Sequence, residues 1–136
     1  MKPRERLAKV IRDAAAGGEP ALVAFLTAGY PSAAKFREHL LAVAAGADVV
    51  EIGVPFTDPM ADGVTIQRSS QAALKQGVSL KWILDELRAM QRPSTPLVLT
   101  GLLLFGARGL GAMPGAASAG HLVASWLVSF SAGAWQ

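Results

Sequence analysis

The sequence predicts an α/β protein in which successive βα units build a parallel sheet. Three short apolar runs alternate with segments whose apolar residues recur at helical spacing. Parallel strands require a crossover connection, and a helix after each strand provides it. With 136 residues, of which 51% are hydrophobic, the chain can form one domain around a single core.

The first helix is expected over residues 3–16, because Gly17 and Gly18 follow directly and end it. Its basic residues could bind phosphate, but they face away from an apolar stripe and are better interpreted as the solvated side of the helix. That stripe consists of Leu7, Val10, Ile11 and Ala14. Residues 21–27 form a short apolar run, which predicts a buried strand.

Two further βα units follow. Ser32 is placed to cap a helix that ends at Gly46, and residues 47–55 predict a second buried strand. A loop over residues 56–63 leads to a helix over 64–76, and Ser79 is placed to cap another. Residues 97–99 begin a third strand. The apolar residues that recur at helical spacing are Phe36, Leu40, Val43, Ala44, Leu80, Ile83, Leu84 and Leu87.

Charge divides the chain into residues 1–99 and residues 100–136. The first part holds 22 of the 23 charged side chains, and the second holds only Arg108. Translation of GC-rich codons in a shifted frame is the favoured interpretation of this Gly/Ala/Leu/Ser tail. A membrane segment is disfavoured, because the apolar runs fall short of the ~20 residues that a span needs. A genuine alternative end could instead cover the sheet with Trp126, Leu127, Val128 and Phe130.

The composition argues against several kinds of site. Without cysteine, the chain can form no disulfide, thiolate metal site or thiol nucleophile. His39 and His121 lie in unrelated segments, so no metal site is expected. A net charge of +3 is too small to indicate nucleic-acid binding. Acidic residues interrupt the basic N-terminus, so we expect a cytoplasmic protein rather than an exported one.

Glu51 and Asp62 are the residues best suited to chemistry. Glu51 stands inside an otherwise apolar strand, where a charged carboxylate is costly and proton exchange is favoured. Asp62 lies in the loop that follows the same strand, and sites in parallel α/β folds form at that end. In the alternative interpretation, Asp58 and Asp62 cap the next helix and Glu51 meets a backbone or arginine partner.

The segments around these carboxylates resemble the alpha subunit family of tryptophan synthase. The likeness is carried by Phe25-Leu-Thr-Ala-Gly-Tyr-Pro31, by Asp48-Val-Val-Glu-Ile-Gly-Val-Pro-Phe-Thr-Asp-Pro-Met-Ala-Asp-Gly63 and by Thr65-Ile-Gln67. It covers roughly residues 1–99. The resemblance implies the N-terminal βα units of a (βα)8 TIM barrel, truncated in this chain.

The family cleaves indole-3-glycerol phosphate to indole and glyceraldehyde 3-phosphate in tryptophan biosynthesis. By this resemblance, Glu51 is the general acid/base that protonates indole C3 and helps to take the proton from the glycerol hydroxyl. Asp62 accepts a hydrogen bond from the indole N–H and stabilises developing positive charge. Phe25 packs on the indole, and Thr27 lies beside it under the pocket.

The resemblance also implies a partner, the beta subunit, in a tetramer of two alpha and two beta subunits. Pro55, Asp58 and Pro59 are expected to face that subunit and to couple the two sites. Pyridoxal phosphate belongs to the beta subunit, so no cofactor is expected in this chain. No nucleic-acid or membrane partner is expected.

Beyond Gly106 the sequence departs from the family. A TIM barrel takes ~250 residues, and its phosphate site usually follows strands seven and eight. We therefore expect little or no lyase activity from the isolated chain, and aggregation through an open sheet edge. The alternative function is a non-catalytic module that binds and modulates the beta subunit. Another phosphate-sugar barrel enzyme is disfavoured, because related barrels lack the loop over residues 55–63.

Overall fold

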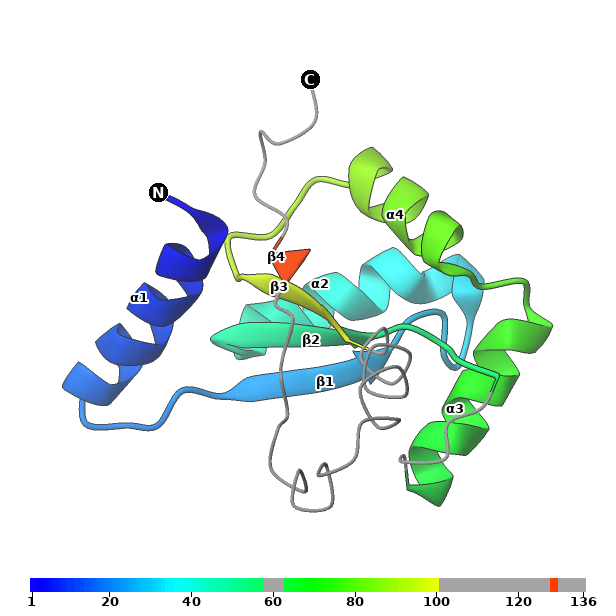
Figure 1. The fold of residues 1–136 in the computed structure, drawn as a ribbon, viewed down its shortest axis with the longest axis horizontal. Helices are drawn as coiled ribbons and strands as arrows, with labels where there is room; N and C mark the ends of the chain where they lie inside the picture. Colours follow the sequence, from blue (N-terminus) through cyan, green and yellow to red (C-terminus); the bar gives the residue numbers. More distant parts are fainter. Residues whose placement is uncertain (58–62, 101–127, 130–136) are drawn as a thin grey trace, which may run out of the picture.

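A computed structural model describes residues 1–57, 63–100 and 128–129 of the chain (Figure 1). Within these residues, and apart from a short 3-10 helix, the helices and strands follow the predicted order through the third strand, including the two successive helices that precede it. The elements are α1 (Pro3–Ala16), β1 (Val23–Thr27), the 3-10 helix η1 (Ala33–Lys35), α2 (Phe36–Gly46), β2 (Val49–Gly53), α3 (Val64–Lys75), α4 (Leu80–Ala89), β3 (Leu97–Thr100) and β4 (Val128–Ser129).

Local sequence explains where several helices begin. Pro3 stands in the first turn of α1, where its missing N–H leaves no hydrogen bond unmade. Ser79 caps α4 as predicted, because its Oγ accepts a 3.1 Å hydrogen bond from the backbone N–H of Trp82. Ser32 occupies the N-cap of η1, but its side chain makes no capping hydrogen bond. The expected capping role of Ser32 is therefore wrong, since the chain enters a 3-10 turn before α2.

The sheet has the order β1-β2-β3-β4 among the described residues. The first three strands are parallel, as expected from the helices between them, and β4 pairs antiparallel with β3. The register places Phe25, Glu51 and Val98 side by side across the parallel strands. Because side chains at paired positions of parallel strands share a face, these three belong to the same face of the sheet.

The main core lies between the other face of the sheet and helices α2, α3 and α4 (Figure 1). Val50 and Ile52 of β2 are fully buried there, together with Leu40 of α2 and Ile83 of α4. These residues come from the apolar positions that recur at helical or strand spacing, so pattern and packing agree. This core holds the strands in place beneath the face that carries Glu51.

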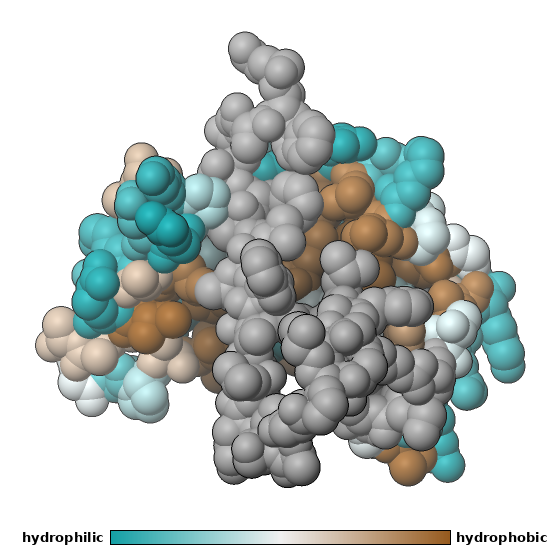
Figure 2. Space-filling model, viewed as in Figure 1, coloured by the Kyte–Doolittle hydropathy of each residue, from teal (hydrophilic) through white to brown (hydrophobic). Residues whose placement is uncertain are grey.

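A smaller cluster packs α1 against the Glu51 face of the sheet. Leu7 is buried with Val49 and Val98, and Val10 packs against them. Ile11, predicted on the same apolar stripe, is 43% exposed. Figure 2 shows hydrophilic side chains over the outer surface of α1, as expected for the solvated side of an amphipathic helix.

The expectation that β1 is a buried strand is wrong. Its exposure alternates along the strand, with Val23 at 49% and Phe25 at 41%, whereas β2 is buried at four of its five positions. A continuous apolar run does not distinguish these cases, because burial depends on what covers the second face. No strand lies beyond β1 among the residues that the structure describes. Most of residues 100–136 lie outside those residues.

Candidate active site

Glu51 occupies the centre of β2 and is the one half-buried residue in an otherwise buried strand. Its neighbours across the sheet are Phe25 on β1 and Val98 on β3. Within the described part of the chain, no side chain or backbone group forms a hydrogen bond or ion pair with its carboxylate. The alternative interpretation, in which a backbone or arginine partner satisfies Glu51, finds no support in these residues. Glu51 lies between the apolar residues Phe25 and Val98 and has no partner among the described residues. Its carboxylate is therefore suited to exchange a proton with a ligand.

Gly53 allows the ring of Phe25 to lie against the end of β2. A Cβ atom added at Gly53 would lie 2.5 Å from Cζ of Phe25 and 2.8 Å from its Cε2 atom. Only a glycine therefore lets the ring lie this close to the strand. Because Phe25 and Glu51 are paired in the register, the exposed aromatic side chain and the carboxylate share one face of the sheet.

Thr27 ends β1 and is buried, at 6% exposed. Its hydroxyl lies 2.7 Å from the Oγ atom of Ser69 on α3. Ser69 donates its own proton to the carbonyl of Ile66 at 2.9 Å, so Thr27 is the donor in this pair. The hydroxyl of Thr27 thus connects the carboxyl end of β1 to α3 and keeps its lone pairs.

The loop after β2 is described only at its two ends. Pro55, predicted to face a partner, is buried within the chain, and the backbone N–H of Val54 donates to the carbonyl of Thr100 at 2.8 Å. Asp58, Pro59 and Asp62 lie outside the described residues. Gly63 occupies the N-cap of α3 and has no side chain with which to cap it.

Ser69 and Gln76 form tertiary contacts that the sequence analysis missed. Ser69 is 6% exposed and belongs to the same helical face as Ala73, which is fully buried. A serine among the apolar positions of a helix signals a buried hydroxyl that needs a partner. Gln76 carries no comparable signal, because a glutamine after a helix is ordinarily a surface residue.

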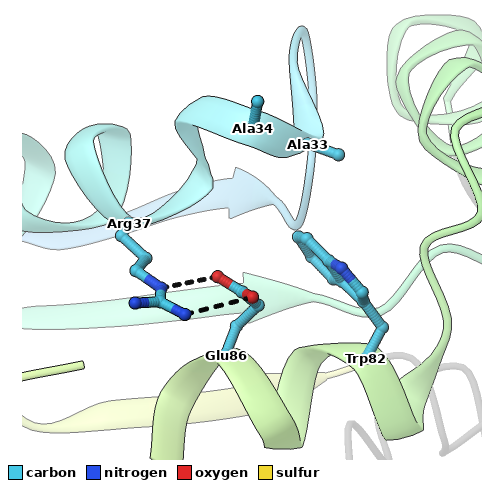
Figure 3. Close-up of a pocket in the computed structure, with 5 residues that line it drawn as sticks. All are labelled: Ala33, Ala34, Arg37, Trp82 and Glu86. Atoms are coloured by element: carbon cyan, nitrogen blue, oxygen red, sulfur yellow. Dashed lines mark hydrogen bonds and ion pairs between the residues drawn. The ribbon is translucent and has the colours of Figure 1, made fainter. Parts of the chain in front are cut away.

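A surface pocket lies apart from this face, between η1, α2 and α4 (Figure 3). Arg37 and Glu86 line it and form a bidentate ion pair, with N–O distances of 2.6 and 3.2 Å. The hydrogen bond to Glu86 raises the pKa of Arg37, although desolvation opposes the shift. Trp82 forms the opposite wall and packs on Phe36 with ring centroids 5.4 Å apart. Both charged groups are already paired, so this pocket offers no obvious chemistry.

The described residues contain no cluster of three or more His, Asp or Glu side chains that could hold a metal ion. Nor does any helix among them have the length and apolar character to cross a membrane. Among the described residues, this face of the sheet carries the carboxylate of Glu51 next to the aromatic ring of Phe25.

Parallel strands with helices α2, α3 and α4 packed on one face, and the Glu51 carboxylate on the other, form the arrangement found in part of a (βα)8 barrel. A sequence model of the family described as "Tryptophan synthase alpha chain" matches residues 11–105. The chain belongs to this family, and the resemblance inferred from its motifs is confirmed.

Individual proteins that are similar to the chain carry the same family name. The tryptophan synthase alpha chain of Nitratidesulfovibrio vulgaris strain DP4 is 52% identical over 100 residues, covering 72% of this chain and 39% of the relative. The solved tryptophan synthase subunit alpha of Legionella pneumophila strain Paris is 31% identical, with a TM-score of 0.65 over 74% of this chain and 41% of that one. Tryptophan synthase of M. tuberculosis, in an aminoacrylate-bound form, gives 32% identity and a TM-score of 0.63, covering 77% and 45%.

The likeness extends over only part of each relative. The chain spans 39% of the length of the Nitratidesulfovibrio relative and 41% of the Legionella structure. The solved relatives are TIM barrels, so the predicted fold class, the N-terminal βα units of such a barrel, is confirmed.

Proposed function

We propose that this chain takes part in the alpha reaction of tryptophan synthase, which is the cleavage of indole-3-glycerol phosphate to indole and glyceraldehyde 3-phosphate. The observation that carries this proposal is the Glu51 carboxylate beside Phe25, which has no partner among the described residues and lies on a strand within the family match. The reaction is inferred from family membership. The sheet face carries Glu51 as the proposed acid/base, next to the aromatic ring of Phe25.

The reaction breaks the bond between indole C3 and the first glycerol carbon. A proton is added to C3, and the hydroxyl on the glycerol carbon loses its proton as the aldehyde forms, so the step is neutral in protons. Glu51 is suited to transfer these protons, because no neighbouring residue in the described part of the chain holds its carboxylate. Phe25 can stack on the indole plane from the neighbouring strand.

Asp62 is assigned to the indole N–H, where a carboxylate stabilises the positive charge that develops as C3 is protonated. Thr27 is assigned to the floor of the same pocket. Its hydroxyl donates to Ser69, so Thr27 can offer only lone pairs to a ligand. Asp58 and Pro59 are assigned to contact with a beta subunit, which would hold pyridoxal phosphate and consume the indole in the cytoplasm. Pro55 is buried within the chain, so it would support this loop rather than contact the partner directly.

We expect the isolated chain to turn over slowly or not at all. In TIM barrels the phosphate group of a substrate is usually held by loops after strands seven and eight. Binding energy from such a remote group lowers the barrier at the reacting carbon. The family match ends at residue 105, so the matched part supplies the acid/base without this anchor.

The test is indole release from indole-3-glycerol phosphate by the 136-residue chain, alone and mixed with a tryptophan synthase beta subunit. Glu51→Gln should abolish whatever release is found, because the amide cannot exchange the proton. Glu38→Gln is the matched control, since Glu38 is an exposed residue of α2. Release that survives Glu51→Gln would contradict the assignment of the acid/base.

A second candidate function is a non-catalytic module that binds and modulates the beta subunit. It is favoured by the extent of the match, which includes the whole loop after β2 while spanning 39% of a relative's length. Under this function the chain stimulates the beta reaction equally well with or without Glu51→Gln. Indole release that is lost in Glu51→Gln would favour the lyase instead.

A further inference from the structure

One side chain connects the end of α3 to the turn that follows β1. The Oε1 atom of Gln76 accepts a 2.8 Å hydrogen bond from the backbone N–H of Ala33. Its Nε2 atom lies 3.3 Å from the carbonyl oxygen of Gly29 and 3.1 Å from that of Pro31. A third carbonyl, that of Ala72 in α3, is 3.2 Å away. Gln76 thus joins its own helix to a turn more than forty positions earlier in the chain.

The turn that contains Gly29 also packs against Val78, two positions after Gln76. Gly29 has a φ of +78°, and a Cβ atom there would lie 2.4 Å from Cγ2 of Val78. Val78 is 2% exposed, so this approach is part of the packed core. The hydrogen bond between Thr27 and Ser69 adds a third connection between the carboxyl end of β1 and α3. Phe25 lies two positions before Thr27 on the same strand.

The chemistry of the contact requires an amide. One backbone N–H and three carbonyl oxygens face the side chain of Gln76, so the position needs an acceptor and a donor together. A carboxylate would keep the acceptor but turn an oxygen towards three carbonyl oxygens. The residue itself is exposed, so water competes for these bonds and a single loss should have a moderate effect.

We propose that Gln76 is a positioning residue, which holds the Gly29–Ala33 turn and thereby the Phe25–Thr27 end of β1 beside Glu51. This inference rests on the proposed function, because it assigns the position of Phe25 a role in binding the indole substrate. Gln76 itself touches no reacting atom. Its effect reaches the substrate through the turn and the strand end.

The test compares Gln76→Glu with Gln71→Glu in the full chain. Gln71 is an exposed residue of α3, so the control makes the same chemical change on the same helix. Amide hydrogen exchange of the segment over residues 29–35 should be about tenfold faster in Gln76→Glu and unchanged in Gln71→Glu. Exchange of β2 should be unchanged in both, which shows that the fold persists. Unchanged exchange over residues 29–35 in Gln76→Glu would overturn the proposal.

A second measurement separates positioning from local stability. The dissociation constant for indole-3-glycerol phosphate, measured by calorimetry, should rise several-fold in Gln76→Glu and remain at the wild-type value in Gln71→Glu. A looser turn with unchanged affinity would overturn the positioning role. If the wild-type chain fails to bind the substrate, the proposed function itself fails, whatever the exchange data show.

Lowering the pH should partly restore the lost contact in the Gln76→Glu variant. The carboxyl group that Gln76→Glu introduces regains one O–H donor for the facing carbonyls when it is protonated, whereas its charged form has none. At pH 4, below the ordinary Glu pKa of about 4.3, the exchange and affinity of Gln76→Glu, each divided by the wild-type value at the same pH, should move back towards one relative to pH 8. Ratios that are equal at the two pH values would show that the donor is not what positions the turn.

Discussion

Gly29→Ala tests whether the turn after β1 is fixed by close packing or only by its backbone conformation. Gly29 and Gly18 both have positive φ, +78° and +86°. A Cβ at Gly29 meets Cγ2 of Val78 at 2.4 Å, whereas nothing lies within 4 Å of one at Gly18. The two glycines therefore share the conformational requirement and differ in the steric one.

The two requirements can be converted into free energies of unfolding. An alanine in the left-handed region costs about 1–2 kcal/mol at either position. At Gly29 the new methyl also overlaps a buried side chain, and such overpacking costs about 1–3 kcal/mol more. We therefore expect Gly29→Ala to lower the free energy of unfolding by about 2–5 kcal/mol, and Gly18→Ala by about 1–2 kcal/mol.

Urea unfolding followed by far-ultraviolet circular dichroism measures both changes. A double substitution isolates the steric part, because Val78→Ala removes the Cγ2 atom that the new methyl would strike. The coupling between Gly29→Ala and Val78→Ala should be about 1–3 kcal/mol, in the direction that relieves the clash. Equal losses for Gly29→Ala and Gly18→Ala, with additive behaviour in the double variant, would refute the reasoning.

Two further predictions concern α4. Ser79→Ala should lower the free energy of unfolding by about 1 kcal/mol, because Ser79 accepts the hydrogen bond from Trp82. Ser32→Ala should change this free energy little, because Ser32 makes no capping bond. Equal effects of the two substitutions in urea unfolding would contradict the cap. The hydrogen bond from Lys81 lowers the pKa of Asp85 below its ordinary 3.8, so the carboxylate contributes stability above that value and loses it as the pH falls through its folded pKa. The melting temperature of Asp85→Asn should therefore fall less than that of the wild type between pH 5 and pH 2. That difference should shrink in high salt, because the pair is exposed, and parallel pH profiles would refute it.

Much of the secondary structure could be predicted from local patterns. The helix over residues 3–16 begins and ends where expected, and the strands differ from the predicted runs by a few residues. These elements are set by interactions between residues close in sequence, such as caps, glycine stops and apolar spacing. The exposure of β1 could not be predicted in this way. An apolar run has the same sequence whether one or both faces are covered.

The candidate site could likewise be predicted from the sequence only in part. Glu51 could be found from sequence because a carboxylate in an apolar strand is unusual, and the motif around it is specific to one family. Phe25 was found through that motif, but its contact with Gly53 depends on strand register. Asp58, Pro59 and Asp62 stay predictions.

The sequence by itself determined the order of the βα units, the family and the placement of a carboxylate inside the second strand. These follow from short-range periodicity and from a continuous motif. Only the tertiary structure decided that Gln76 holds the turn after β1 and that Thr27 donates to Ser69. Such contacts join residues more than forty positions apart. No local pattern encodes them, because each partner alone resembles an ordinary polar residue until packing brings the helix against the strand end.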